Sequence, residues 1–518
     1  MPGPVKFPGV FVEERSSSVR VIDGVETSVT AFIGRAVRGP TDGDDSGAGG
    51  KVNVFSFGDY ERVFGGLWVE SAMSYAVRDF FDNGGRRAVI IRVFHADGPS
   101  RAMIRAGTVE LVAASPGAWG NRLTVEIDHA TGPADPEMDG MLFNLAVTDA
   151  GTGTSERFMN VTVVENQPMS LDRVLEGKSD LVRVEPGSMG GARPDATTAP
   201  LVVESLVNDG AALDESDLLG QADAKSGLYA LNKVELVNLV CVPPYLAGGE
   251  VDLSVLAAAA QICVDRRAFL IIDAPVGWTT SEAAARGVGS IREALGENGR
   301  NAAVYFPWLC QPDPLRGGEV GVFPPCGAVA GVFARTDEVR GVWKGPAGVE
   351  AVLKGVGSLS VLVDDRENAV LNPLGVNCLR LMAGFGPLVW GSRTLRGADG
   401  LGDSTWRYVP VRRLGLYIEE SVVRATRWAV FEPNDERLWE RLGINIDAIL
   451  QGLFRQGAFA GSSAAEAYFV RCDATTTVTA DVASGLVNVQ VGFAPMKPAE
   501  FVVLNIRVMA GQEGGSEK

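Results

Sequence analysis

The segment Met496–Met509, near the C-terminus, has the pattern of a β-strand with no following element to pair with. Every second residue from Val502 to Val508 is aliphatic and the residues between them are mixed, as in a strand with one apolar face. Pro8–Glu14 (PGVFVEE) is a second extended segment, which precedes the first globular pattern. Because an unpaired strand invites pairing with another chain, we expect both segments to link copies of this chain. The predicted linking residues are Val10, Phe11, Val12, Phe501, Val502, Val503, Leu504, Ile506 and Val508.

The alternative is that both terminal strands pair within their own chain. Ordering about ten residues costs roughly 10–20 kcal/mol of backbone entropy. About five strand hydrogen bonds return roughly 0.5–1.5 kcal/mol each, and burying four aliphatic side chains returns roughly 6–12 kcal/mol. These terms nearly cancel for one arm. We therefore expect arms that become ordered only with a partner, although the residues alone leave both arrangements open.

Length and charge limit the class of protein. A chain of 518 residues with 46% hydrophobic residues is expected to fold into two to four domains. Its formal net charge of −17 makes nucleic-acid binding by phosphate neutralisation improbable. Copies of such a chain repel one another, so assembly requires strong local contacts.

The sequence shows no targeting or membrane signal. No cationic segment followed by an apolar run stands at the N-terminus, so we expect no signal peptide. No run of about eighteen apolar residues is present, so we expect no membrane insertion. Six cysteines lie too far apart for a Cys-x-x-Cys pair, and we expect buried free thiols at 241, 263, 310, 326, 378 and 472.

Catalytic and metal-binding patterns are largely missing. The two histidines, His95 and His129, have no His or Cys at metal-ligand spacing, and no nucleophile elbow or phosphate-binding glycine loop occurs. The acidic stretches 42–45 and 135–139 do not follow the calcium-loop pattern and are expected to be solvated loops. Asp364-Asp365 is expected to be a loop or helix-cap pair. We therefore predict no catalytic, cofactor or metal site and no enzymatic activity.

Strand and helix patterns indicate an α/β fold with an insertion. Strands are expected at 29–33, 88–93, 235–242, 268–273 and 302–306, with a helix over 253–265 among them. Ser71 is expected to cap another helix, whose inward side is Met73, Ala76, Val77, Phe80 and Phe81. This alternation favours a largely parallel sheet covered on both faces. From 104 to 200, short alternating runs separated by turn residues predict an all-β module. The expected divisions are 1–28 (arm), 29–103 (α/β core, first part), 104–200 (inserted module), 201–404 (α/β core, second part), 405–495 (second α/β unit) and 496–518 (strand and polar tail).

The second α/β unit carries two predicted helices. Arg412–Trp428 is expected to be helical, with Leu414, Ile418, Val422 and Ala425 along one side. Asn434 is expected to cap the next helix, whose apolar side is Leu438, Leu442, Ile446, Ile449 and Leu453. Strands follow at 467–472 and 486–491.

Short motifs along nearly the whole chain resemble those of contractile tail sheath proteins, the family of contractile phages, R-type pyocins and extracellular contractile injection systems. Each motif is unspecific alone, but their order over roughly five hundred residues is specific. They include PGVFVEE (8–14), AFIGRAVRGP (31–40), FGDYERVFGGL (57–67), SPGAWGN (115–121), GVWKGPAG (341–348), LNPLGVNCLR (371–380), YVPVRRLGLYIEE (408–420), WAVFEPND (428–435) and VGFAPMKPAEF (491–501).

The resemblance implies a structural sheath subunit that polymerises as stacked hexameric rings around an inner tube protein and contracts. It implies a subtilisin-like α/β core without a working triad, and a C-terminal sheath domain. Expected partners are further copies, the tube, baseplate and terminator or cap proteins, and sheath paralogues where present. Assembly is expected in the bacterial cytoplasm, with release by lysis. The alternatives are a subtilisin-like hydrolase and a static shell or baseplate component.

A sheath must hold its tube reversibly, and exposed ion pairs are individually weak enough for that. The charged residues at the start of the helix after Asn434 are the candidate tube contact: Asp435, Glu436, Arg437, Glu440 and Arg441. A merely solvated helix face is the alternative.

Overall fold

The computed structural model describes residues 25–41, 51–132, 140–189, 191–245, 249–401, 405–496 and 502–509. These residues form two compact units, one from Glu26 to Tyr417 and the other from Ile418 onward. Within the described ranges, no helix is both long and apolar enough to cross a membrane.

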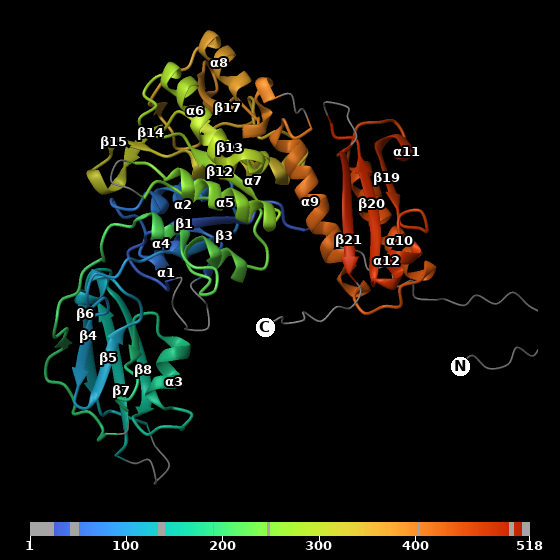
Figure 1. Cartoon of the computed structure of the whole chain (residues 1–518). Helices are drawn as coiled ribbons and strands as arrows, with labels where there is room; N and C mark the ends of the chain where they lie inside the picture. Colours follow the sequence, from blue (N-terminus) through green and yellow to red (C-terminus); the bar gives the residue numbers. More distant parts are fainter. Residues whose placement is uncertain are drawn as a thin grey trace, which may run out of the picture. The chain divides into compact units, whose positions relative to one another are not determined.

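An eight-stranded sheet forms the centre of the Glu26–Tyr417 unit (Figure 1). Its order is β18-β17-β13-β12-β11-β1-β3-β2, and the six inner strands run parallel. Both edge strands, β18 and β2, are antiparallel to their neighbours. The expected parallel sheet is thus present. The strands are β1 Thr30–Gly34, β2 Lys51–Val54, β3 Ala88–Arg92, β11 Leu239–Cys241, β12 Phe269–Asp273, β13 Ala302–Phe306, β17 Val376–Met382 and β18 Gly386–Val389.

Helices between the strands bury both faces of the sheet. Every residue of β1, β3 and β13 is buried, as in a covered parallel sheet. Ser71 caps α2 as predicted, because its side chain accepts a hydrogen bond from the Ser74 amide, although Phe81 on this helix is only half-buried. The helices are α1 Phe57–Phe64, α2 Ala72–Asp82, α4 Glu215–Leu219, α5 Leu253–Asp265, α6 Ser281–Leu295, α7 Cys326–Arg340 and α8 Asp365–Leu371.

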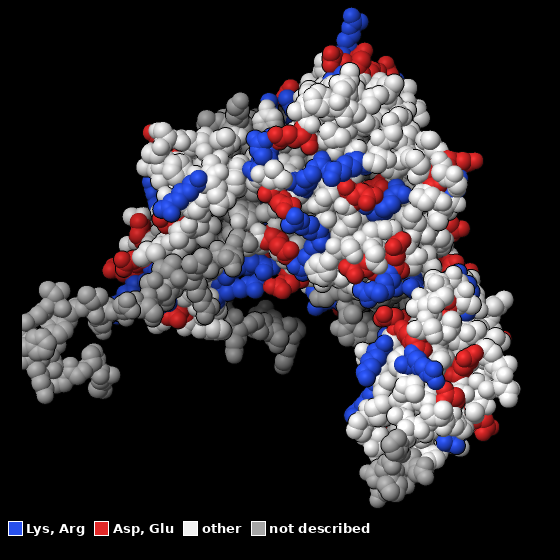
Figure 2. Space-filling model, turned by 180° about the vertical axis from the view of Figure 1, so that it is seen from behind, with Lys and Arg blue, Asp and Glu red and all other residues white. Residues whose placement is uncertain are grey.

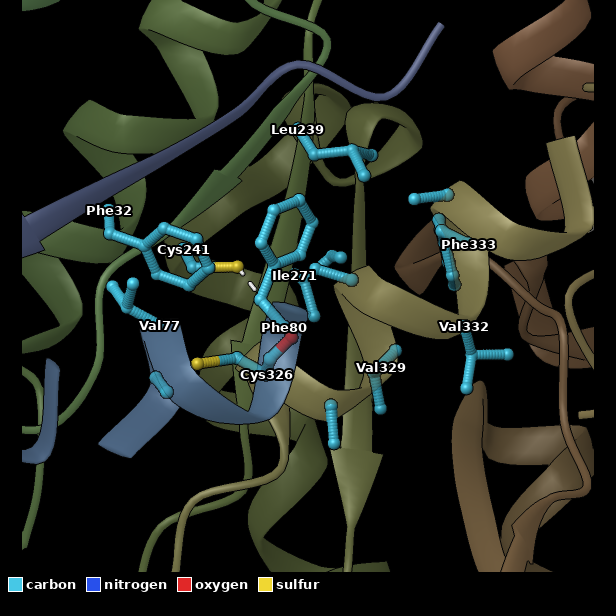
Figure 3. Packing of buried hydrophobic residues seen from close by; sticks show 14 of the residues in the cluster. Phe32, Val77, Phe80, Leu239, Cys241, Ile271, Cys326, Val329, Val332 and Phe333 are labelled. Carbon is cyan, nitrogen blue, oxygen red and sulfur yellow. Dashed lines mark hydrogen bonds between the residues drawn. The ribbon is translucent and has the colours of Figure 1, made fainter. Parts of the chain in front are cut away.

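Helices α2 and α7 pack with their backbones in close contact because α7 carries glycines on the facing side. A Cβ atom on Gly327 would overlap the carbonyl oxygen of Ala76, and one on Gly331 would lie 2.5 Å from that of Phe80. Figure 3 shows Phe80 of α2 and Cys326 of α7 in one cluster with Phe32 of β1. Glycine is therefore the residue that this contact requires.

A small sheet, β15-β14-β16, extends from the core after β13. Its strands are β14 Leu309–Asp313, β15 Glu319–Phe323 and β16 Ser358–Leu359. One side is attached to α2, where the Tyr75 hydroxyl donates to Asp313 over 2.9 Å and the Gln311 amide donates to Asp79 over 2.8 Å.

The inserted segment forms two further sheets with their own apolar core. The orders are β4-β5-β9 and β10-β6-β7-β8. The segment also contains helix α3 (Leu171–Lys178), so the expectation of strands alone is wrong there; Leu171, Val174 and Leu175 bury one helical face. The strands are β4 Met103–Ala106, β5 Val109–Ala113, β6 Leu123–Asp128, β7 Leu142–Asp149, β8 Thr154–Thr162, β9 Val182–Val184 and β10 Leu201–Val202.

The motif SPGAWGN attaches the inserted segment to the core. The Ser115 hydroxyl accepts a hydrogen bond from the Gly39 amide at 2.9 Å. Buried Arg92, at the end of β3, donates to the carbonyl of Pro116 at 2.8 Å and also to the carbonyls of Ala36, Val37 and Gly39. Trp119 is buried in the segment's own core. The motif therefore has a structural role at this junction.

The unit from Ile418 onward consists of two long helices and the antiparallel sheet β19-β20-β21. Helix α9 (Val409–Thr426) begins in the first unit and continues into this one. The other elements are α10 Glu436–Arg455, α11 Ala464–Ala467, α12 Thr479–Ala483, β19 Tyr468–Arg471, β20 Leu486–Phe493 and β21 Val502–Met509.

Asp435, and not Asn434, caps α10, so the predicted cap was wrong by one residue. The Asp435 side chain accepts a hydrogen bond from the Leu438 amide. Asn434 instead donates to the carbonyl of Leu486 at 2.9 Å and accepts from the indole of Trp439 at 2.8 Å. Leu438, Leu442, Ile446 and Leu453 are buried as predicted, whereas Ile449 is half-buried and Leu450 takes the inner position.

Candidate assembly surfaces

The predicted C-terminal linking strand forms β21, which pairs with β20 of the same chain over the whole of its length. The register places Val502, Leu504, Ile506 and Val508 opposite Phe493, Val491, Val489 and Val487, which are all buried. If copies exchanged this strand, β21 of one copy would pair with β20 of the next in the same register. The pairing within one chain is therefore compatible with both arrangements, and exchange stays a prediction. The linking residues Val10, Phe11, Val12 and Phe501 lie outside the described residues.

The β19-β20-β21 sheet packs on α10. The Tyr468 hydroxyl on β19 lies 2.7 Å from a side-chain oxygen of Gln451 and 3.2 Å from one of Asp447. The ring of Phe459 contacts those of Tyr468 and Phe493, at 5.9 and 5.8 Å between centroids. In the described part of this sheet, β19 and β21 are the outer strands. Strand edges on both sides are therefore available for further pairing.

The five candidate tube-contact residues are all exposed at the start of α10. Glu436, Arg437 and Glu440 point away from the buried side, whereas Asp435 also serves as the cap. Arg441 lies 3.6 Å from Glu432 and stacks over the ring of Trp428 at 4.3 Å. An open groove next to Glu440 runs between α10 and β19 and includes Trp439, Ile444 and Arg471. The structure brings these charges together on one surface but leaves their role open.

The sequence analysis missed one exposed aromatic residue beside this surface. Phe431, in the loop before α10, is 82% exposed and has a φ of 72°. A bulky residue in this left-handed region is unusual and stores backbone strain. No residue pattern marks such a conformation, although Phe431 lies inside the WAVFEPND motif.

The histidines and cysteines have structural partners. His95 Nδ1 lies 2.8 Å from Asp217, which raises the pKa of His95, and His129 Nε2 lies 2.9 Å from the carbonyl oxygen of Pro194. Asp214 and Asp217 complete the cap of α4, so their proximity to His95 has a structural explanation. All six cysteines are free; four are buried, while Cys310 and Cys472 are half-buried. Burial raises the pKa of Cys378 to about 12, which keeps that thiol protonated.

Two acidic groups have different surroundings. Asp364 caps α8 through a capping box with Glu367, which confirms the predicted cap pair. Asp273, at the end of β12, accepts a hydrogen bond from the Cys326 amide at the start of α7 over 2.7 Å. Its second oxygen is buried without a hydrogen-bond partner, and burial raises the pKa of Asp273 to about 7.

The surface charge is mixed. Figure 2 shows Lys and Arg side chains interspersed with Asp and Glu on the face drawn there. The described part of that face has no continuous basic surface of the kind that binding to nucleic acid requires.

Comparison with known proteins identifies the fold. Residues 402–509 match the family model of the phage tail sheath C-terminal domain. The anti-feeding prophage (AFP) helical sheath in its contracted state is 25% identical with a TM-score of 0.55, and the match covers 96% of this chain and 98% of that one.

Two further solved structures share the fold at lower identity. The PVC sheath complex of an extracellular contractile injection system, also contracted, is 22% identical (TM-score 0.55; 97% and 98% covered). Sheath tail protein Lin1278 from Listeria innocua is 12% identical (TM-score 0.62; 94% and 96% covered). A comparison with curated proteins finds no match. Residues 402–509 therefore match a phage tail sheath C-terminal domain, and the chain shares its fold, nearly end to end, with solved contractile sheath structures.

Proposed function

We propose that the protein is the sheath subunit of a contractile injection apparatus, which forms stacked hexameric rings around an inner tube and contracts to drive it through a target envelope. The observation that carries this proposal is the fold agreement with the contracted AFP sheath over nearly the full length of both chains. Electron microscopy of the purified protein tests it. Hollow tubes or short stacked rings are expected, and a protein that stays monomeric or forms closed shells contradicts the proposal.

The role is structural rather than catalytic, with a subtilisin-like α/β core that lacks a working triad. Within the described residues neither histidine forms a hydrogen bond with a serine hydroxyl, since His95 pairs with Asp217 and His129 with the carbonyl of Pro194, and this supports the assignment. A covalent serine-hydrolase probe separates the alternatives: a sheath subunit stays unlabelled, and stoichiometric labelling of one serine favours a hydrolase.

Terminal strands from neighbouring copies complete each other's sheets. The outer position of β21 supports this proposal, because a strand at a sheet edge can be donated without opening the core. A contact of this head-to-tail kind need not close, so it can propagate along a helix. Deletion of residues 496–518 is expected to abolish polymers and leave a folded subunit. Intact polymers from the deletion variant, or equal protease protection of 496–512 in monomer and polymer, contradict strand exchange.

The start of α10 contacts the inner tube. Its charged side chains are exposed, and exposed ion pairs break and re-form easily. The double variant Glu436→Lys, Glu440→Lys is expected to form sheath polymers but to lose assembly on the tube. The matched control is Glu176→Lys on the exposed side of α3. If the double variant still assembles on the tube as wild type does, the start of α10 is a solvated surface and does not contact the tube.

Further partners follow from the same role. A baseplate structure of AFP contains a chain with this fold, 24% identical, which supports baseplate association. We expect assembly in the bacterial cytoplasm, with cap proteins at the far end, and release by lysis. Pull-down with baseplate components tests the first of these partners.

A further inference from the structure

The Glu26–Tyr417 unit is joined to the rest of the chain at two places. One connection runs between Val25 and Glu26, and the other lies inside α9, between Tyr417 and Ile418. In a sheath subunit, force between the two units must pass through these connections or through surface contacts. The residues that anchor these connections therefore carry part of that force.

One side chain, Arg413 on α9, holds both connections. Its guanidinium donates two hydrogen bonds to the carboxylate of Asp337 on α7, at 2.7 and 2.6 Å. The same group donates to the backbone carbonyl of Thr27 at 2.8 Å. Thr27 is the second residue of the unit, and Arg413 lies four residues before the point where α9 leaves it.

The surroundings of this ion pair are closed to solvent. The side chains of Arg413 and Asp337 are 3% and 2% exposed, and the guanidinium lies 5.0 Å from the ring centre of Phe333, one turn earlier on α7. Bidentate pairing and stacking need the planar fork of arginine. A buried ion pair adds little to stability over an apolar pair but fixes geometry, because a misplaced charge would be left without a partner.

The preceding residue, Arg412, has the same chemistry and also anchors α9. It donates to the side chain of Asn301 at 2.8 Å and stacks on Trp406 at 4.5 Å from the ring centre. Asn301 and Trp406 both lie within the larger unit, whereas the hydrogen bond to Thr27 comes from Arg413. Arg412 is therefore a natural comparison for Arg413.

We propose that Arg413 is a clamp that fixes both connections to one point on α7, and that the part of the chain from Ile418 onward turns about this point during contraction. A load carried by either connection then reaches α7 through one side chain, and α9 is held close to the point where it leaves the unit. The turning during contraction rests on the proposed sheath function; the clamp itself does not.

Hydrogen–deuterium exchange of the free subunit tests the clamp. In Arg413→Met, amide exchange is expected to rise roughly tenfold or more in both 26–32 and 409–417, because a hydrogen bond to a charged donor is lost from each segment. In Arg412→Met, exchange is expected to rise in 409–417 only. The clamp is refuted if the amides of 26–32 stay as protected in Arg413→Met as in wild type. It is also refuted if Arg412→Met reduces their protection as much as Arg413→Met does.

If Arg413→Met does not fold, the variant Arg413→Lys tests the clamp in its place. Lysine retains a positive charge beside Asp337 but lacks the fork that reaches Thr27 as well. Exchange is then expected to rise in 26–32 and to stay low in 409–417; unchanged exchange in 26–32 contradicts the clamp.

Sheaths assembled from Arg413→Lys are expected to contract at lower temperature or denaturant concentration than sheaths of Arg412→Lys. An equal threshold refutes the turning point. If the wild-type chain forms no sheath, the proposed function fails, and the exchange result still decides the clamp.

Discussion

Replacement of Asp273 by asparagine should change how the stability of the protein depends on pH. Asp273 is a carboxylic acid whose pKa is raised by burial from 3.8 to about 7. One of its oxygens accepts a hydrogen bond from the Cys326 amide, and the other has no hydrogen-bond partner. Asparagine can keep the first contact and carries no charge.

The sign follows from proton binding. The folded protein holds the proton of Asp273 more tightly than the unfolded chain does, so this group stabilises the fold fully below pH 3.8. That contribution is lost as the pH rises towards 7. The complete loss corresponds to about 4 kcal/mol, of which about 3 kcal/mol falls between pH 5 and pH 8. The variant has no such loss.

Urea unfolding of wild type and Asp273→Asn from pH 5 to pH 8 measures the effect. The variant is expected to gain about 3 kcal/mol relative to wild type across this range. The asparagine amide has one group without a hydrogen-bond partner, and this shifts the free energy of unfolding by the same amount at every pH. Such a shift does not change how the free energy of unfolding depends on pH. Exposed Asp223→Asn is the control and should follow the wild-type curve. Parallel curves for wild type and Asp273→Asn refute the argument that burial raises the pKa of Asp273.

Three further substitutions test helix packing and capping. Gly327→Ala should destabilise the protein by roughly 1–3 kcal/mol or more in chemical denaturation, because its Cβ would overlap the carbonyl oxygen of Ala76. Gly289→Ala, at an exposed position of α6 with open space around it, is the control and should stabilise by up to about 1 kcal/mol. Equal effects of the two glycine substitutions would contradict the close α2–α7 contact. Asp435→Ala should cost about 1 kcal/mol by loss of the α10 cap, measured in the same way, and an unchanged midpoint would mean that the cap is unimportant.

The sequence predicted β1, β3, β11, β12 and β13 of the central sheet, because these strands are continuous apolar runs separated by helices, but it did not predict β2, β17 or β18. Helix α5 was predicted with its observed bounds, and Ser71 was identified as a cap because serine before an apolar helical pattern has a local physical reason. The α10 cap was missed by one residue because Asn434 and Asp435 are both good caps. Only the tertiary contacts of Asn434 with Trp439 and Leu486 decide between them.

Features that depend on distant residues were not predictable. Arg413 and Asp337 are 76 residues apart in the sequence, and nothing in either neighbourhood indicates that they meet. The exposed Phe431 depends on a backbone angle that residue patterns do not encode. The charged start of α10 was found because helical spacing gathers its side chains locally.

The two outer strands of the C-terminal sheet are not equivalent. β19 and β21 both run antiparallel to β20, but they differ in sequence, so the two edges of the sheet present different residues to a partner. A polymer joined through such a sheet would have two distinct ends, as a filament with a head and a tail does. A protein that binds only one of these ends would then determine the orientation of the whole particle.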